Sequence, residues 1–184
     1  AAPGEFTLDG SGDDGALLQV TADGTLTTRA SGMPNPNAIA TLPGGTVVVS
    51  DDTAALYVDG GLWSDAVPSP NGMAVDGDTL YVVSTFVADP PLWAVPINDG
   101  VAGTPVEVTR FETGDTPDGV ALDADNGLWV ALNAPGAIVQ MDLTDGTITD
   151  RIEGFTTPAS LSFGDLSAAP CTLYVTELYG TRVL

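Results

Sequence analysis

The sequence predicts an all-β fold made of short antiparallel strands, and three observations support this prediction. Apolar residues alternate with polar ones or run in short β-branched groups, a pattern typical of strands rather than of amphipathic helices. Gly, Pro or Asp-Gly interrupts these groups every several residues, and eight Asp-Gly pairs supply residues that tolerate positive φ in hairpin turns. Four segments of the chain also resemble one another, which indicates a repeated unit.

The repeated unit starts with a proline, followed in three copies by Asn or Asp and then by small and apolar residues. The four copies are residues 36–40, 70–74, 117–121 and 158–162. Each is followed, after a short turn, by a second strand: residues 46–50, 79–83, 127–131 and 172–176. The copies begin 34, 47 and 41 residues apart. A period of about 40 to 50 residues with four short strands per unit predicts the blades of a β-propeller.

The outer strands of a blade are clearest at residues 137–142 and 147–152. Residues 16–20 and 25–29 show the same outer pair without an inner pair before it. The C-terminal copy has an inner pair and then begins a third strand at residues 181–184. The chain therefore holds about three complete blades and two partial ones, or about four blades' worth of strands.

Two arrangements fit these strands. The C-terminal inner strands could pair with the N-terminal outer strands and close a four-bladed ring. Alternatively, the chain is part of a larger propeller, which we favour because residues 182–184 add a strand that a composite blade does not need. An open ring exposes strand edges, so we expect self-association or a partner chain that completes the propeller. The length predicts one domain, residues 1–184, with a flexible acidic N-terminus at residues 1–14.

The amino-acid composition excludes several classes of function. The chain has 25 Asp and Glu residues against four Arg and a formal net charge of −21, so nucleic acid is excluded as a partner. It has no histidine, which removes Ser-His-Asp and Cys-His catalysis and His-ligated zinc or haem. The single cysteine, Cys171, cannot form an intrachain disulfide and is interpreted as a small apolar strand residue. Any catalysis must use carboxylates, hydroxyls or a bound cation.

The sequence also gives an expectation for the cellular location of the protein. With 43% apolar residues and no apolar stretch near the roughly 18 residues of a membrane span, the chain is predicted to be a soluble globule without such a span. Its first residues, Ala1-Ala2-Pro3, would suit the mature end left by signal-peptide cleavage, although truncation of a longer chain would look the same. We therefore expect a secreted or periplasmic protein, with a cytoplasmic location as the alternative.

The repeat predicts where chemistry could lie, because the first strand of every blade lines the central channel of a propeller. The residues after the four prolines then form one ring around the axis: Asn37, Asn71, Asp118 and Ala159. Three of them offer a side-chain oxygen, the ligand type that Ca²⁺ prefers. The competing interpretation is that Asn and Asp after Pro only shape turns. Residues at the end of the second strand could add further ligands: Asp51, Ser84, Leu132 and Glu177.

Two other groups of residues do not predict a site. Residues 9–15 have the composition of a calcium loop, but the glycine comes one place late and position twelve would be Val20 instead of Glu. Trp63, Trp93 and Trp129 recur on strands of different repeats and are interpreted as blade packing rather than as a platform for a ligand.

A motif in the third repeat is specific enough to compare with known families. It consists of Pro117-Asp118-Gly119 followed by Asp123-x-Asp125-x-Gly127-Leu128-Trp129-Val130-Ala131, and Pro70-Asn71-Gly72 matches its first part. With these residues the sequence resembles the gluconolactonase/regucalcin (senescence marker protein) family, over about residues 36 to 184. Related lactonases and strictosidine-synthase-like propellers share parts of the motif.

The resemblance implies a six-bladed propeller with one divalent cation on its axis, Ca²⁺ or another such as Zn²⁺, Mn²⁺ or Mg²⁺. It implies that Asn71 and Asp118 bind the cation and that Asn37 lies near metal and substrate. The implied reaction is hydrolysis of a small-molecule lactone or ester, in which the cation polarises the carbonyl. Asp118 is the implied general base, acting alone or together with water on the cation.

The sequence departs from this family in one respect. The family's glutamate ligand and a substrate-binding arginine lie far upstream of the Asn that matches Asn37, and Glu5 is too close to Asn37 to serve. Either the ligand set is incomplete or the absent blades lie outside this chain. Metal-dependent hydrolysis is the leading hypothesis. The alternatives are a non-catalytic exported propeller that binds proteins or surfaces, and a small-molecule carrier without turnover.

Overall fold

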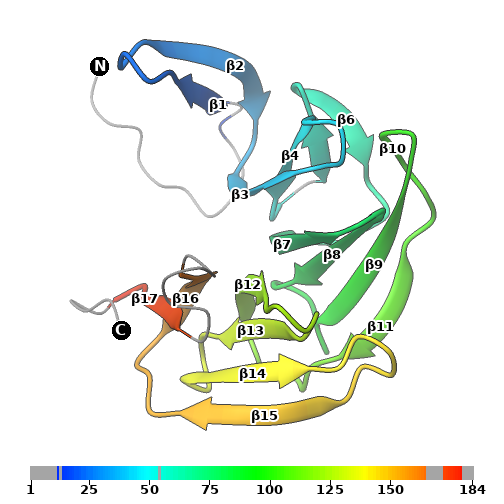
Figure 1. Ribbon diagram of the computed structural model, residues 1–184, viewed down its shortest axis with the longest axis vertical. Helices are drawn as coiled ribbons and strands as arrows, with labels where there is room; N and C mark the ends of the chain where they lie inside the picture. The colour runs from blue at the N-terminus through cyan, green and yellow to red at the C-terminus, as the bar shows by residue number, and fades with distance from the viewer. Residues whose placement is uncertain (1–11, 13, 54, 165–171, 180–184) are drawn as a thin grey trace.

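The computed structural model describes residues 12, 14–53, 55–164 and 172–179, and these residues form strands joined by turns. The described strands group into five antiparallel sheets, which follow one another along an arc (Figure 1). Within the described residues, no helix has the length and apolar character needed to cross a membrane.

Three of the sheets are complete blades, and their strands pair in chain order from the inside of the arc outward. The first blade consists of β3 (Pro36–Thr41), β4 (Val47–Asp51), β5 (Leu56–Val58) and β6 (Gly61–Ser64). The second consists of β7 (Pro70–Asp76), β8 (Thr79–Ser84), β9 (Pro91–Asn98), β10 (Val101–Ala102) and β11 (Val106–Arg110), of which the last two both pair with β9. The third consists of β12 (Pro117–Leu122), β13 (Leu128–Leu132), β14 (Ala137–Met141) and β15 (Ile148–Glu153).

Two partial sheets lie at the ends of the arc (Figure 1). The N-terminal sheet is β1 (Gly15–Val20) with β2 (Leu26–Met33), and the C-terminal sheet is β16 (Pro158–Phe163) with β17 (Leu173–Glu177). They do not pair with each other, so the described strands form no composite blade. Residues 182–184, which favoured the open arrangement, lie outside the described residues. The predicted three complete blades and two partial ones are confirmed for the described part of the chain.

The first strands of the three blades and of the C-terminal sheet, β3, β7, β12 and β16, lie side by side in that order. We call the place where these four strands begin the hub. Of the Asp-Gly pairs, Asp59-Gly60 and Asp99-Gly100 form turns with positive φ at both residues, as predicted. Asp118-Gly119 is different, because it lies inside β12 at the hub.

Apolar side chains fill the space between neighbouring blades. On β8, Leu80 and Val82 pack toward the first blade, whereas Tyr81 and Val83 pack toward the third. Successive residues of a strand face opposite sides, so a blade covered on both faces carries apolar residues at consecutive positions. Trp63 and Trp93 pack between the first two blades, and Trp129 packs edge-on against Phe163 with 6.4 Å between ring centroids.

Candidate functional site at the hub

Each first strand begins with a β-bulge directly after its proline. In the first blade Pro36 pairs with Asp51 while Ile39 pairs with Val49, so β3 contains one residue more than β4 over this stretch. The same shift follows Pro70, Pro117 and Pro158. A bulge breaks the regular alternation of side chains and redirects one of them, which is why bulges are frequent beside functional sites. The residue directly after the proline lies in the bulge in every copy.

The bulges bring three polar side chains together. Asn37, Asn71 and Asp118 line two cavities, of about 340 and about 550 Å³. The smaller cavity continues along the first strands and also contains Ala159. The larger one, which we call the hub cavity, extends past the ends of the second strands. The structure therefore places the three predicted residues around the same two cavities, while their roles in binding and catalysis stay predictions.

Glycine allows the first strands to approach closely at this point. A Cβ atom on Gly72 would lie 2.0 Å from the carbonyl oxygen of Asp118, and one on Gly119 would lie 2.4 Å from that of Ala159. Neither position could hold a side chain without moving the adjacent strand. The glycine after Asn71 thus keeps Asn71 and Asp118 close together on neighbouring strands.

Asn71 has a buried amide oxygen that lacks a partner. The residue is 3% exposed, and no donor among the described residues forms a hydrogen bond with its Oδ1. A buried carbonyl oxygen without a donor is destabilising by about 1–3 kcal/mol, so such atoms are rare in folded proteins. The position suits a cation or an ordered water at the hub.

Asp118 lies beside Asn71 with few donors around it. Burial raises the pKa of Asp118, a hydrogen bond from Asn133 lowers it, and the charge of Asp52 raises it again, so the net shift is upward. The Nδ2 atom of Asn133 lies 3.2 Å from Oδ2 of Asp118 and also donates to the carbonyl oxygen of Pro158. Asn133 therefore fixes the orientation of the Asp118 carboxylate.

Asp52 is a second carboxylate in the hub cavity, which the sequence did not indicate. It is 5% exposed, and burial raises its pKa despite hydrogen bonds from Asn35 and Asn37; the charge of Asp51 raises it further. Nδ2 of Asn37 donates to Oδ2 of Asp52 over 3.2 Å. Asp52 thus holds Asn37 in place and adds negative charge near Asp118.

The structure corrects the residues expected at the ends of the second strands. Asp51, Ser84, Leu132 and Glu177 pair with the four prolines and do not line the hub cavity. Asp51 instead accepts hydrogen bonds from Asn35 and Thr53, and Glu177 accepts one from the backbone of Thr156. The cavity is lined by the next residue of each copy: Asp52, Thr85, Asn133 and Leu178.

The reason is the alternation of side chains along a strand, since a shift of one residue turns a side chain to the opposite side. In three of the four copies the residue at the later position is polar, namely Asp52, Thr85 and Asn133. This pattern could have identified the residues that line the hub cavity.

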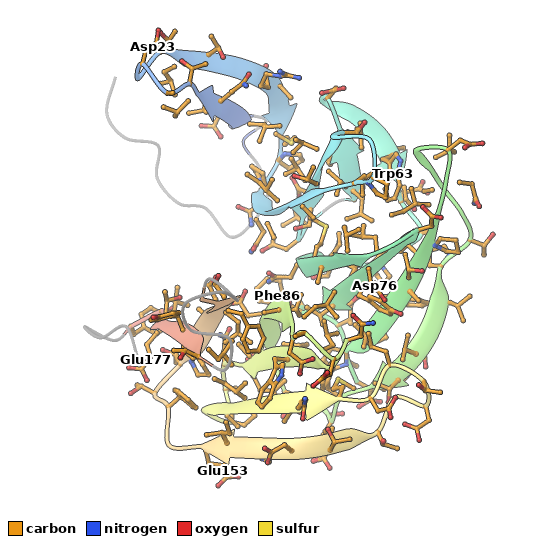
Figure 2. The ribbon with its side chains drawn as sticks, in the orientation of Figure 1. Asp23, Trp63, Asp76, Phe86, Glu153 and Glu177 are labelled. Carbon is orange, nitrogen blue, oxygen red and sulfur yellow. The ribbon has the colours of Figure 1, made fainter. Side chains whose placement is uncertain are left out.

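The entrance of the hub cavity is apolar. Phe86, Leu178 and Tyr179 line it, and all three are exposed. Figure 2 shows Phe86 between the second blade and the C-terminal sheet, with Glu177 on that sheet, whereas Glu153 lies on the outermost strand of the third blade. The cavity therefore has polar groups at its inner end and an apolar rim.

The described residues contain no cluster of three or more His, Cys, Asp or Glu side chains that could hold a metal. The candidate ligands at the hub are two carboxylates and amide oxygens. Glu5, Cys171 and most of the acidic segment at residues 9–15 lie outside the described residues.

Comparison with known proteins identifies the family. The model of the SMP-30/gluconolactonase/LRE-like region matches residues 56–178. The chain belongs to this family. The matched segment includes Asn71 and Asp118 but neither Asn37 nor Asp52. No curated protein matches the chain.

Solved structures share the β-propeller fold and confirm the predicted fold class. A calcium-binding regucalcin from Agrobacterium tumefaciens is 26% identical, with a TM-score of 0.70, over 92% of this chain and 64% of that one. A gluconolactonase from Xanthomonas campestris is 23% identical, with a TM-score of 0.69, over 88% and 62%. A chain of a nidogen/laminin complex is 20% identical, with a TM-score of 0.74, over 91% and 66%. This chain spans less than two thirds of the length of each.

Proposed function

We propose that the chain is a divalent-metal-dependent hydrolase that acts on a lactone or an ester. The observation that carries the proposal is the buried Oδ1 of Asn71, which no described donor reaches and which shares the hub cavity with Asp52 and Asp118. Membership of the family supports it, as does the similarity to a gluconolactonase and to a calcium-binding regucalcin.

The residues at the hub fit a hard divalent cation. Asn71 would supply its amide oxygen, Asp118 its carboxylate, and Asp52 a second negative charge in the same cavity. Carboxylate and amide oxygens favour Ca²⁺, Mg²⁺ or Mn²⁺ over ions that prefer imidazole or thiolate ligands. The chain contains no histidine that could supply an imidazole. Bound there, the cation would polarise the carbonyl group of the substrate.

Asp118 would act as the general base. Without a cation, burial and the charge of Asp52 raise its pKa, whereas a cation bound to the same carboxylate would lower it. Asp118 would accept a proton from a water molecule whose oxygen bonds to the carbonyl carbon. The bond between that carbon and the ester oxygen then breaks, and the proton passes to the departing oxygen. Asn133 would hold the carboxylate in position, and Asn37, held by Asp52, would contact the substrate.

The test is hydrolysis of a panel of lactones and aryl esters with added Ca²⁺, before and after chelation, for three proteins. Asp118→Asn removes the base while keeping an oxygen, so we expect kcat/KM to fall by about 10²-fold or more. Asp78→Asn makes the same change of charge at an exposed residue in the turn between β7 and β8, so we expect it to retain activity. Equal activity in Asp118→Asn and the unsubstituted chain would contradict the proposal.

A further inference from the structure

We infer that the substrate of the hub site is an uncharged lactone or ester with an apolar substituent, which packs on Phe86, Leu178 and Tyr179. The identity of the reacting group rests on the proposed function. The apolar class of the substituent rests on separate evidence, namely the rim of the hub cavity.

The rim exposes a group of large apolar side chains at one place. Phe86 is 60% exposed, Leu178 57% and Tyr179 81%, and the three share one cavity with the polar groups of the hub. A contiguous exposed apolar surface next to a few convergent polar groups is the usual composition of a small-molecule site. The rim is continuous with the proposed reaction centre, so its occupant is part of the same molecule that reaches Asp118.

The repeat holds the two aromatic residues in place. The backbone N–H of Phe86 donates to Oγ of Ser69 over 3.0 Å, and the N–H of Tyr179 donates to Oγ1 of Thr157 over 3.2 Å. Both acceptors directly precede the proline that starts a first strand. The third blade makes the same contact with Ala134 in place of an aromatic residue. The aromatic side chains therefore project from a backbone that is anchored to the hub, which is the arrangement of a preformed binding surface.

The protein side chains that line the cavity disfavour an anionic group on the substrate away from the proposed cation. Its described lining contains the carboxylates of Asp52 and Asp118 and no arginine, and the whole chain carries a formal charge of −21. A phosphate or carboxylate on the substrate would meet like charge without a cationic partner from the protein. A polyhydroxylated substrate would place hydroxyl groups against the apolar rim, where they would lose their hydrogen bonds with water. An uncharged, apolar substituent avoids both the repulsion by the carboxylates and the loss of hydrogen bonds with water.

The experiment compares γ-lactones that carry linear alkyl groups of one to six carbons with D-glucono-δ-lactone. We expect kcat/KM to rise by about threefold for each added methylene, as expected for partial burial of the chain, and to exceed the value for the sugar lactone. Phe86→Ala and Tyr179→Ala should flatten this dependence on chain length. Tyr174→Ala, an exposed tyrosine on β17 that does not line the cavity, should leave it unchanged. A preference for D-glucono-δ-lactone, or no dependence on chain length, would overturn the inference.

A binding measurement separates this inference from the proposed function. γ-Lactams with the same alkyl groups resist hydrolysis, so calorimetry in the presence of Ca²⁺ reports their affinity without turnover. Affinity that rises with chain length in the unsubstituted chain but not in Phe86→Ala supports the apolar class even where no lactone is hydrolysed, and then only the hydrolase proposal fails. Affinity that is independent of chain length overturns the inference, whatever the chain hydrolyses.

Discussion

Asp118 lies near the start of β12 and Asp123 directly follows its end, and their surroundings shift the pKa values of the two carboxylates in opposite directions. At the hub, burial and the charge of Asp52 raise the pKa of Asp118, and the hydrogen bond from Asn133 does not offset them. The Asp118 carboxylate therefore binds a proton more strongly than an exposed one, and a cation nearby would relieve the like charge.

In the turn directly after β12, the carboxylate of Asp123 accepts hydrogen bonds from several neighbouring groups. Burial raises its pKa, but hydrogen bonds from four groups outweigh burial and lower the pKa below its ordinary value. The donors are Nε1 of Trp129, the backbone N–H of Gly127, Nε2 of Gln140 and the backbone N–H of Asp125, at 2.8 to 2.9 Å. This carboxylate joins the turn after β12 to β13 and β14.

The comparison separates a structural aspartate from a candidate catalytic one. Both residues belong to the motif by which the sequence resembles its family, so the motif alone does not distinguish them. The distinction comes from the number of donors and from neighbouring charge: four donors around Asp123, and one donor with a second carboxylate nearby for Asp118. The predictions below test this difference.

The largest effect on stability is expected from Asp123→Ala. The substitution removes the acceptor of four hydrogen bonds, so the free energy of unfolding should fall by about 2–4 kcal/mol. The measurement is urea unfolding without metal. In the same assay Asp118→Asn should be as stable as the unsubstituted chain or more so, because it removes a buried charge. Equal losses in both variants would show that the two ends of β12 do not differ as described.

The next effect is expected from Gly72→Ala. The new Cβ would meet the carbonyl oxygen of Asp118, so β7 and β12 must move apart, with a loss of about 1–3 kcal/mol and weaker Ca²⁺ binding. Gly61→Ala is the control, because a Cβ there would lie 3.5 Å from the carbonyl oxygen of Val58, at ordinary contact distance. Unfolding and Ca²⁺ titration of both variants provide the check. A Gly72→Ala protein that binds Ca²⁺ normally would argue against close approach at the hub.

A smaller effect is expected from Asp52→Asn. Removal of one negative charge should weaken Ca²⁺ binding by about tenfold, which reduces the stabilisation by saturating Ca²⁺ by about 1.4 kcal/mol. Thermal unfolding with and without Ca²⁺ measures this difference. Asp78→Asn should retain the full Ca²⁺-dependent stabilisation. If the two variants respond alike, Asp52 contributes only general negative charge.

The smallest effect concerns pH and Asp123. Because the pKa of Asp123 is lowered in the folded state, its contribution to stability is complete above the unfolded-state value of about 3.9 and is lost as the pH falls through the folded-state pKa. The stability difference between the unsubstituted chain and Asp123→Asn should therefore shrink as the pH is lowered from 6 toward 3. Urea unfolding across this range measures it, and a difference that stays constant would contradict the assigned hydrogen bonds.

Much of the hub could be predicted from the sequence because the repeat is visible in the chain. A proline followed by Asn or Asp recurs at Asn37, Asn71 and Asp118, and repetition around an axis requires such residues to lie on one ring. The prediction placed Asp51 rather than Asp52 at the hub, one residue too early. The side to which a side chain points depends on the exact register of its strand with the neighbouring strand.

The rim was beyond prediction from sequence. Phe86 and Tyr179 occupy matching positions, but the other copies hold Thr53 and Ala134 there, so no pattern marks the position. Whether a donor reaches Oδ1 of Asn71 likewise depends on how groups from several strands are placed in space, which the sequence alone does not show.

The most direct test of the account is calorimetric titration of Ca²⁺ into the unsubstituted chain and into Asn71→Leu. We predict one ion bound per chain at the hub, with affinity at least tenfold lower in Asn71→Leu, while Asn71→Leu is at least as stable without metal because it removes the unpartnered oxygen. Identical titrations of the two proteins, with several weakly bound ions attributable to the net charge of −21, would contradict a cation site at the hub.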